Sequence, residues 1–75
     1  MYHTIAFRTE CWVDVEVSPK HWLEHVRVAK GARLQAQVRT YVIETAHGPI
    51  EVADLYFEDG SATRQVRCSC FEFVD

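Results

Sequence analysis

Apolar and polar side chains alternate along residues 4–17, and this period of two limits what the chain can fold into more than any other feature. Successive side chains of a strand point to opposite faces, so the alternation predicts a half-buried β-strand. The segment is either one long strand or two short strands broken near residues 8–10. The apolar side of this segment consists of Ile5, Phe7, Cys11, Val13, Val15 and Val17.

The chain from residue 34 onward predicts a three-stranded antiparallel meander. Residues 34–42 alternate again, and the sequence His47-Gly48-Pro49 marks a turn. Residues 50–57 form the next predicted strand. Asp59-Gly60 is the strongest short hairpin signal in the chain, and it leads into a last strand over residues 62–74.

Two changes of phase interrupt the alternation of these last two strands. After residue 52 the apolar residues move from even to odd positions, which predicts a bulge near Ala53 and Asp54. The same change occurs after Cys70. Without a second bulge there, Phe71 and Phe73 would lie on the outer face of the sheet.

Residues 19–30 carry the signals of a helix. Ser18 suits the N-cap, Pro19 suits the first helical position, and Gly31 suits the position that follows a helix. An apolar stripe at helical spacing contains Trp22, Val26 and Ala29. The sequence therefore predicts an α+β fold in the order β-α-β-β-β. In that fold, a single antiparallel sheet of four or five strands carries the helix, at about residues 19–30, on one face.

An all-β alternative stays open for the same region, because valine alternates with polar residues over positions 25–28. In that case residues 22–28 resemble the first strand of an SH3-like or Tudor-type small barrel. Residues 56–60 resemble the hairpin that often follows in such barrels. The resemblance covers these two short pieces and implies an SH3-like fold. No aromatic ligand cage is carried over to particular residues.

Length and charge set the class of protein. Seventy-five residues predict one small domain over residues 1–75. No apolar run is long enough for a membrane span, and no signal peptide is visible at the start. Three cysteines are an odd number, which argues against a complete disulfide framework and favours a cytoplasmic location. A net charge of −3 disfavours a protein that tracks phosphates.

An open sheet face is the expected functional surface, because one helix covers only one face of so small a sheet. The predicted open face is rich in aromatic residues and arginine, the composition of protein contacts. We therefore expect a non-catalytic interaction module with an accessory or regulatory role, which forms a homodimer or docks on a protein partner. The expected contact residues are Trp12, Arg33, Arg39, Tyr41, Ile43, Arg67, Phe71 and Phe73.

Two alternatives to a protein interface remain. Aromatic side chains can stack on bases while arginines hold phosphates, so the chain could bind RNA or single-stranded DNA. The residues for this alternative are Arg33, Arg39, Arg67, Trp12 and Tyr41. A zinc-stabilised domain could draw ligands from the three cysteines and four histidines, although the usual two-residue gap between paired cysteines is absent.

Catalytic signals are weak. The serines lack the glycines of a nucleophile elbow, and the three glycines are isolated, so they form no phosphate-binding loop. We expect no enzymatic activity, no cofactor, no bound metal, no small-molecule substrate and no membrane partner.

Overall fold

A computed structural model describes residues 1–17 and 22–75. Within them the chain forms strands joined by short turns, and a three-residue 3-10 helix, η1 (Cys68–Cys70), interrupts the last part. The strands are β1 (His3–Phe7), β2 (Cys11–Val17), β3 (Trp22–Val28), β4 (Arg33–Thr45), β5 (Gly48–Phe57), β6 (Ala62–Arg67) and β7 (Phe71–Phe73).

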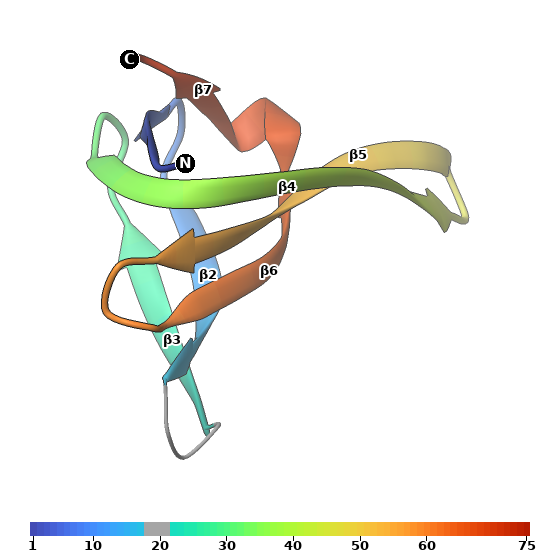
Figure 1. Cartoon of the computed structure of the whole chain (residues 1–75). Helices are drawn as coiled ribbons and strands as arrows, with labels where there is room; N and C mark the ends of the chain where they lie inside the picture. The colour runs from blue at the N-terminus through green and yellow to red at the C-terminus, as the bar shows by residue number, and fades with distance from the viewer. Residues whose placement is uncertain (18–21) are drawn as a thin grey trace.

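All strands belong to one antiparallel sheet with the order β3-β2-β6-β5-β4-β1-β7. The sheet curls, so that the β2–β3 hairpin runs at a steep angle to the long β4–β5 hairpin (Figure 1). Strands β1 and β2 follow each other in sequence but lie four strands apart in this order. The concave side of the curled sheet holds the core.

The predicted helix over residues 19–30 is wrong, and with it the α+β fold. Residues 22–28 form β3, which pairs with β2 from Cys11↔Val28 to Val17↔Trp22. The proposed N-cap positions lie outside the described residues. Gly31 adopts a φ of +85° in the turn between β3 and β4 rather than after a helix. The all-β alternative was the correct class for this region.

The strand predictions outside that region agree better with the structure. Residues 4–17 form two short strands, β1 and β2, broken at residues 8–10. The meander from residue 34 is confirmed as β4–β5–β6, with turns at the predicted places. The structure has an irregularity near Asp54, as predicted, but it affects the pairing of β5 with β6. The register of that pairing shifts between Ala53 and Leu55, whereas β5 pairs with β4 without a break.

The last predicted strand, residues 62–74, is interrupted by η1. This turn reverses the facing of the chain, so Phe71 returns to the core while Phe73 stays half exposed. Cys68 and Cys70 therefore lie on a 3-10 turn and not on a continuous strand.

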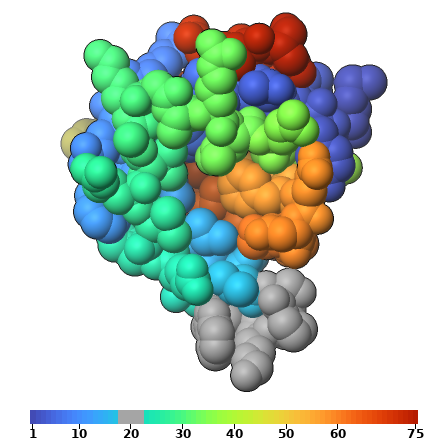
Figure 2. Space-filling model, turned by 90° about the vertical axis from the view of Figure 1, so that its left-hand side faces the viewer, coloured from blue at the N-terminus to red at the C-terminus, as the bar shows by residue number. Residues whose placement is uncertain are grey.

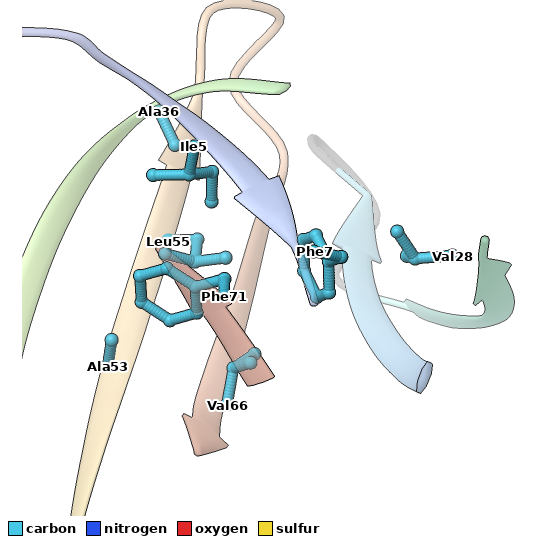
Figure 3. Close-up of a cluster of buried hydrophobic side chains, with 8 residues drawn as sticks. All are labelled: Ile5, Phe7, Val28, Ala36, Ala53, Leu55, Val66 and Phe71. Atoms are coloured by element: carbon cyan, nitrogen blue, oxygen red, sulfur yellow. The ribbon is translucent and has the colours of Figure 1, made fainter. Parts of the chain in front are cut away.

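The core consists mainly of side chains from the concave side of β1, β4, β5 and β7. Ile5 and Leu55 are fully buried and lie next to Phe71 (Figure 3). Phe7 extends the cluster toward Val28 of β3. Leu23 of β3 lies outside this core and is 62% exposed. Within the described chain, no helix has the length and apolar character needed to cross a bilayer.

Candidate interaction surface

A buried carboxylate organises the convex face of β4, β5 and β6. Asp54 of β5 is 3% exposed, and its Oδ1 accepts hydrogen bonds from the Tyr41 hydroxyl at 2.8 Å and from the Gln65 backbone N–H at 3.1 Å. The other oxygen, Oδ2, lies 3.5 Å from both the Tyr56 hydroxyl and an Arg64 guanidinium nitrogen. We call these five residues the Asp54 network.

Charge and hydrogen bonding keep Asp54 ionised despite its burial. Burial by itself raises the pKa of this carboxyl group. The hydrogen bonds from Tyr41 and Gln65, with the nearby charges of Arg64 and Arg39, outweigh burial and hold the pKa below its ordinary value. The Asp54 carboxylate is therefore a buried negative charge that holds the side chains around it in place.

The bulge in β6 is part of this network. Gln65 has a φ of +57°, in the left-handed region that costs a side-chain-bearing residue energy. Its N–H donates a hydrogen bond to the Asp54 carboxylate, and this bond stabilises the strained backbone conformation. Arg64, beside it, also contacts Glu16 of β2 at 2.9 Å and so links the network to the next strand.

The far half of the β4–β5 hairpin extends beyond the rest of the sheet (Figure 1). The pairing of β1 with β4 ends at Ala36, and the pairing of β6 with β5 ends at Val52. Among the described residues, positions 42–51 are therefore paired only with each other, from Val42↔Glu51 to Thr45↔Gly48, and Tyr41 pairs with Val52 at the base of this extension. We call residues 41–51 the β-arm.

The β-arm exposes apolar side chains on both faces. Val42 is 60% exposed on the concave side. Ile43 and Ile50 stand directly opposite each other on the convex side, and both are partly exposed. Isolated two-stranded hairpins are marginal in water, so an extension of this kind is more stable when something packs against it.

The two edges of the β-arm differ. The β5 edge carries Pro49, which has no N–H to donate, and the charged Glu51. The β4 edge has neither proline nor lysine, and it is rich in β-branched and aromatic residues: Thr40, Tyr41, Val42, Ile43 and Thr45. The β4 edge is therefore the one suited to accept another strand.

The structure brings half of the predicted contact residues together. Arg39, Tyr41 and Ile43 follow one another along the convex face of β4, and Arg67 of β6 lies across β5 at the position opposite Val52. The Arg39 guanidinium also lies 5.5 Å from the centroid of the Tyr41 ring.

The other predicted contact residues lie apart from this group. Trp12 is 58% exposed on β2, and Arg33 is exposed at the start of β4. Phe73 is exposed on β7, at the sheet edge beyond β1. Phe71 is only 3% exposed, because the 3-10 turn before it redirects the side chain inward, so it lies in the core and not on this surface.

Trp12 has its own local partners. The indole stacks on the His25 ring with centroids 4.9 Å apart, and His25 Nδ1 lies 2.8 Å from an Asp14 carboxylate oxygen. All three residues are exposed and belong to the convex face of the β2–β3 hairpin. Their contacts explain how Trp12 is held at the surface without a core around it.

An apolar groove opens on the concave side, between β3 and the β5–β6 turn (Figure 2). Its volume is about 480 Å³, and Val13, Val26, Leu34 and Phe57 are among the residues that line it. The groove shows that the curled sheet does not close into a complete barrel.

The cysteines and histidines do not assemble as a metal site in the described part of the chain. No three side chains of the ligand types histidine, cysteine, aspartate and glutamate come close enough there to hold an ion. His3 pairs with Asp75, and His25 pairs with Asp14. The three cysteines are free and partly buried.

Sequence reasoning missed Asp54 as the centre of this face. The available signal was a carboxylate inside the apolar run Val52-Ala53-Asp54-Leu55, since a charge at a buried position needs partners. No protein family model, curated protein or solved structure matches the chain.

Proposed function

We propose that the chain is a non-catalytic protein-interaction module that forms a homodimer through the β4 edge of the β-arm. The observation that carries this proposal is the β4 edge from residue 37 to residue 45, which pairs with no other strand among residues 1–17 and 22–75 and so presents a row of backbone groups. Addition of a strand to such an edge is a common mode of protein recognition. We place the module in the cytoplasm, on the odd number of cysteines.

A second copy suits this edge because the edge is self-complementary. When two β4 strands pair antiparallel about a two-fold axis at Val42, each Tyr41 faces Ile43 of the other copy. Arg39 and Glu44 each face a threonine, so no like charges oppose one another. Aromatic and β-branched cross-strand pairs are stabilising, and a closed two-fold contact leaves no free β4 edge for further association.

The Asp54 network stabilises the base of the β-arm. The hydrogen bond from Tyr41 to Asp54 fixes the tyrosine at the base of the β-arm. The salt bridge from Arg64 to Asp54 and the bond from Arg64 to Glu16 tie that base to β6 and β2. A hairpin anchored in this way loses less conformational freedom when it binds.

The test is the solution mass of the wild-type protein and of two lysine variants by light scattering, at low and high salt. We expect wild type at twice 8.7 kDa. The dimer should persist at high salt because backbone hydrogen bonds and apolar contacts hold it. Val42→Lys is expected to be monomeric, since lysine on an edge strand opposes pairing.

Leu23→Lys is the matched control. Leu23 has nearly the same exposure as Val42 but lies on β3, the first strand of the sheet order and well separated from β4. This variant should remain dimeric, and both variants should keep the wild-type circular dichroism spectrum. A monomeric wild type at millimolar concentration, or a dimer broken by Leu23→Lys and kept by Val42→Lys, would contradict the proposal.

Single-stranded nucleic acid is the second candidate, and one observation favours it. Trp12, Arg64 and Arg67 line the same surface groove of about 380 Å³. Against this, Asp14 lines that groove too, and Arg64 is already paired with Glu16. Anisotropy of a labelled oligonucleotide decides between them: nucleic-acid binding predicts an affinity that falls steeply with salt and weakens in Arg67→Ala.

A further inference from the structure

Two of the three cysteines meet across the fold. Phe7 of β1 pairs with Phe71 of β7, and the Arg8 backbone N–H donates to the Cys70 carbonyl at 2.8 Å. The turn of residues 8–10 then leads directly to Cys11. Cys11 and Cys70 consequently line one groove of about 380 Å³ and pack against the same core cluster.

The thiols of this pair lie close enough for one to influence the titration of the other. Burial raises the pKa of the Cys11 thiol, and the adjacent Cys70 thiol raises it further. Both residues are only partly buried, so reagents in solvent reach them.

Cys68 lies on the same 3-10 turn but has different surroundings. It lines another groove, with Thr40 and Glu51. Burial raises the pKa of Cys68, and the nearby Glu51 carboxylate raises it further. One turn therefore presents two cysteines to two different grooves, and the groove that Cys70 lines is the one that Cys11 lines.

We propose that Cys11 and Cys70 are a redox pair that forms an intramolecular disulfide with glutathione disulfide, while Cys68 remains a thiol. One thiolate of the pair attacks a sulfur of glutathione disulfide, whose S–S bond breaks and releases one glutathione thiolate. The second thiolate of the pair attacks the mixed disulfide and releases the other glutathione. Two protein thiols are oxidised, one glutathione disulfide is reduced, and the two protons that the protein thiols lose are taken up by the two released thiolates, which gives two glutathiones.

The bridge would connect two distant parts of the sheet. Cys11 starts β2, near one end of the strand order, and Cys70 leads into β7 at the other end. The disulfide would tie the curled sheet across its open side and would close a long loop of the chain. Constraint of a long loop in the unfolded state stabilises the folded state.

The experiment incubates the protein with glutathione disulfide, alkylates the remaining thiols under denaturing conditions and maps the labels by mass spectrometry. The reduced protein has three labelled cysteines. After oxidation we expect a label on Cys68 alone, a monomeric mass lower by about 2 Da before alkylation, and full reversal by dithiothreitol. The thermal midpoint should rise by on the order of 10 °C. Oxidation should accelerate from pH 7 to pH 9, because the thiolate is the attacking species.

Cys68→Ser is the matched control for Cys70→Ser, since both change one thiol of the same turn. Cys68→Ser should still form the bridge and Cys70→Ser should not. The peptide map of wild type gives the same information without any variant. A bridge that uses Cys68, a product that stops at glutathione adducts, or three free thiols after oxidation at pH 9 would overturn the proposal.

Discussion

We expect Asp54→Asn to lower the free energy of unfolding by about 1.5–3 kcal/mol, because the carboxylate is the acceptor at the centre of the convex face. Its Oδ1 takes both short hydrogen bonds, from Tyr41 and from the Gln65 N–H. An asparagine that keeps its carbonyl oxygen there must place its NH₂ group at the Oδ2 position, which faces the Arg64 guanidinium. Two donors then meet, and the charge that strengthened every contact is gone.

The magnitude is large for a domain of this size. Stability of about 0.05–0.15 kcal/mol per residue gives a total on the order of 4–11 kcal/mol for the chain. The asparagine variant should therefore lose on the order of 10 °C in thermal midpoint. Asp54→Ala should lose more, about 3–5 kcal/mol, because it leaves the charged and polar partners without any acceptor.

The dependence on pH gives the sharper test. The folded pKa of Asp54 lies below its unfolded value, so the stabilisation is fully present above the unfolded value of about 4 and is lost as the pH falls through the folded pKa. The asparagine variant does not titrate. The difference in stability between the two proteins should therefore shrink as the pH falls from 5 toward the folded pKa.

Urea unfolding followed by tryptophan fluorescence, at pH 7 and at pH 3, measures this difference. Glu58→Gln is the control, because Glu58 is an exposed carboxylate and its loss should change stability by less than about 0.5 kcal/mol. A difference between wild type and Asp54→Asn that is absent at pH 7, or equally large at both pH values, would refute the argument.

Three further outcomes follow from the same structure. Gln65→Gly should leave stability unchanged or raise it by up to about 1 kcal/mol, while Gln65→Val should lower it, because φ is +57° there; urea midpoints give the sign. Leu55→Ala should cost about 2–5 kcal/mol of unfolding free energy, against less than about 0.5 for Leu23→Ala at an exposed position outside the proposed interface. The pKa of Tyr41 is raised, mainly by its hydrogen bond to Asp54, so the stability that depends on the neutral phenol should fall as the pH rises through the folded pKa. In a titration of phenolate absorbance, Tyr41→Phe should lack the step that occurs at the highest pH in the wild-type protein.

Local patterns predicted the strands but failed where short-range and long-range preferences compete. Ser18, Pro19 and Gly31 are helix-boundary residues, and each is worth a fraction of a kcal/mol to about 1 kcal/mol to a helix. Against them stands a seven-pair ladder between β2 and β3, from Cys11↔Val28 to Val17↔Trp22. That ladder also buries Val28 in the core. The local sequence does not reveal how strongly this segment pairs with β2, so the helix-boundary signals led to the wrong prediction.

The candidate surface was predictable only where it stays within one strand. Arg39, Tyr41 and Ile43 share a face by alternation alone, and the structure keeps them together. The approach of Cys70 to Cys11 depends on the pairing of β1 with β7 and on the turn after β6. Contacts that close over most of the chain length leave no trace in local periodicity.

The second change of phase in the sequence explains why a β-arm exists at all. After Arg67 the chain enters the 3-10 turn, and this turn brings Phe71 into the core beside Leu55. Burial of a phenylalanine is worth about 1.5–3 kcal/mol, which is comparable with the few ladder bonds that a longer β6 would add at about 0.5–1.5 kcal/mol each. Because β6 ends there, its pairing with β5 stops at Val52, and residues 48–51 lose their neighbour on that side. The burial of one aromatic residue thus leaves the far half of the hairpin without a neighbour on its β5 side, and a strand paired with the β4 edge, as proposed above, would support it from the other side.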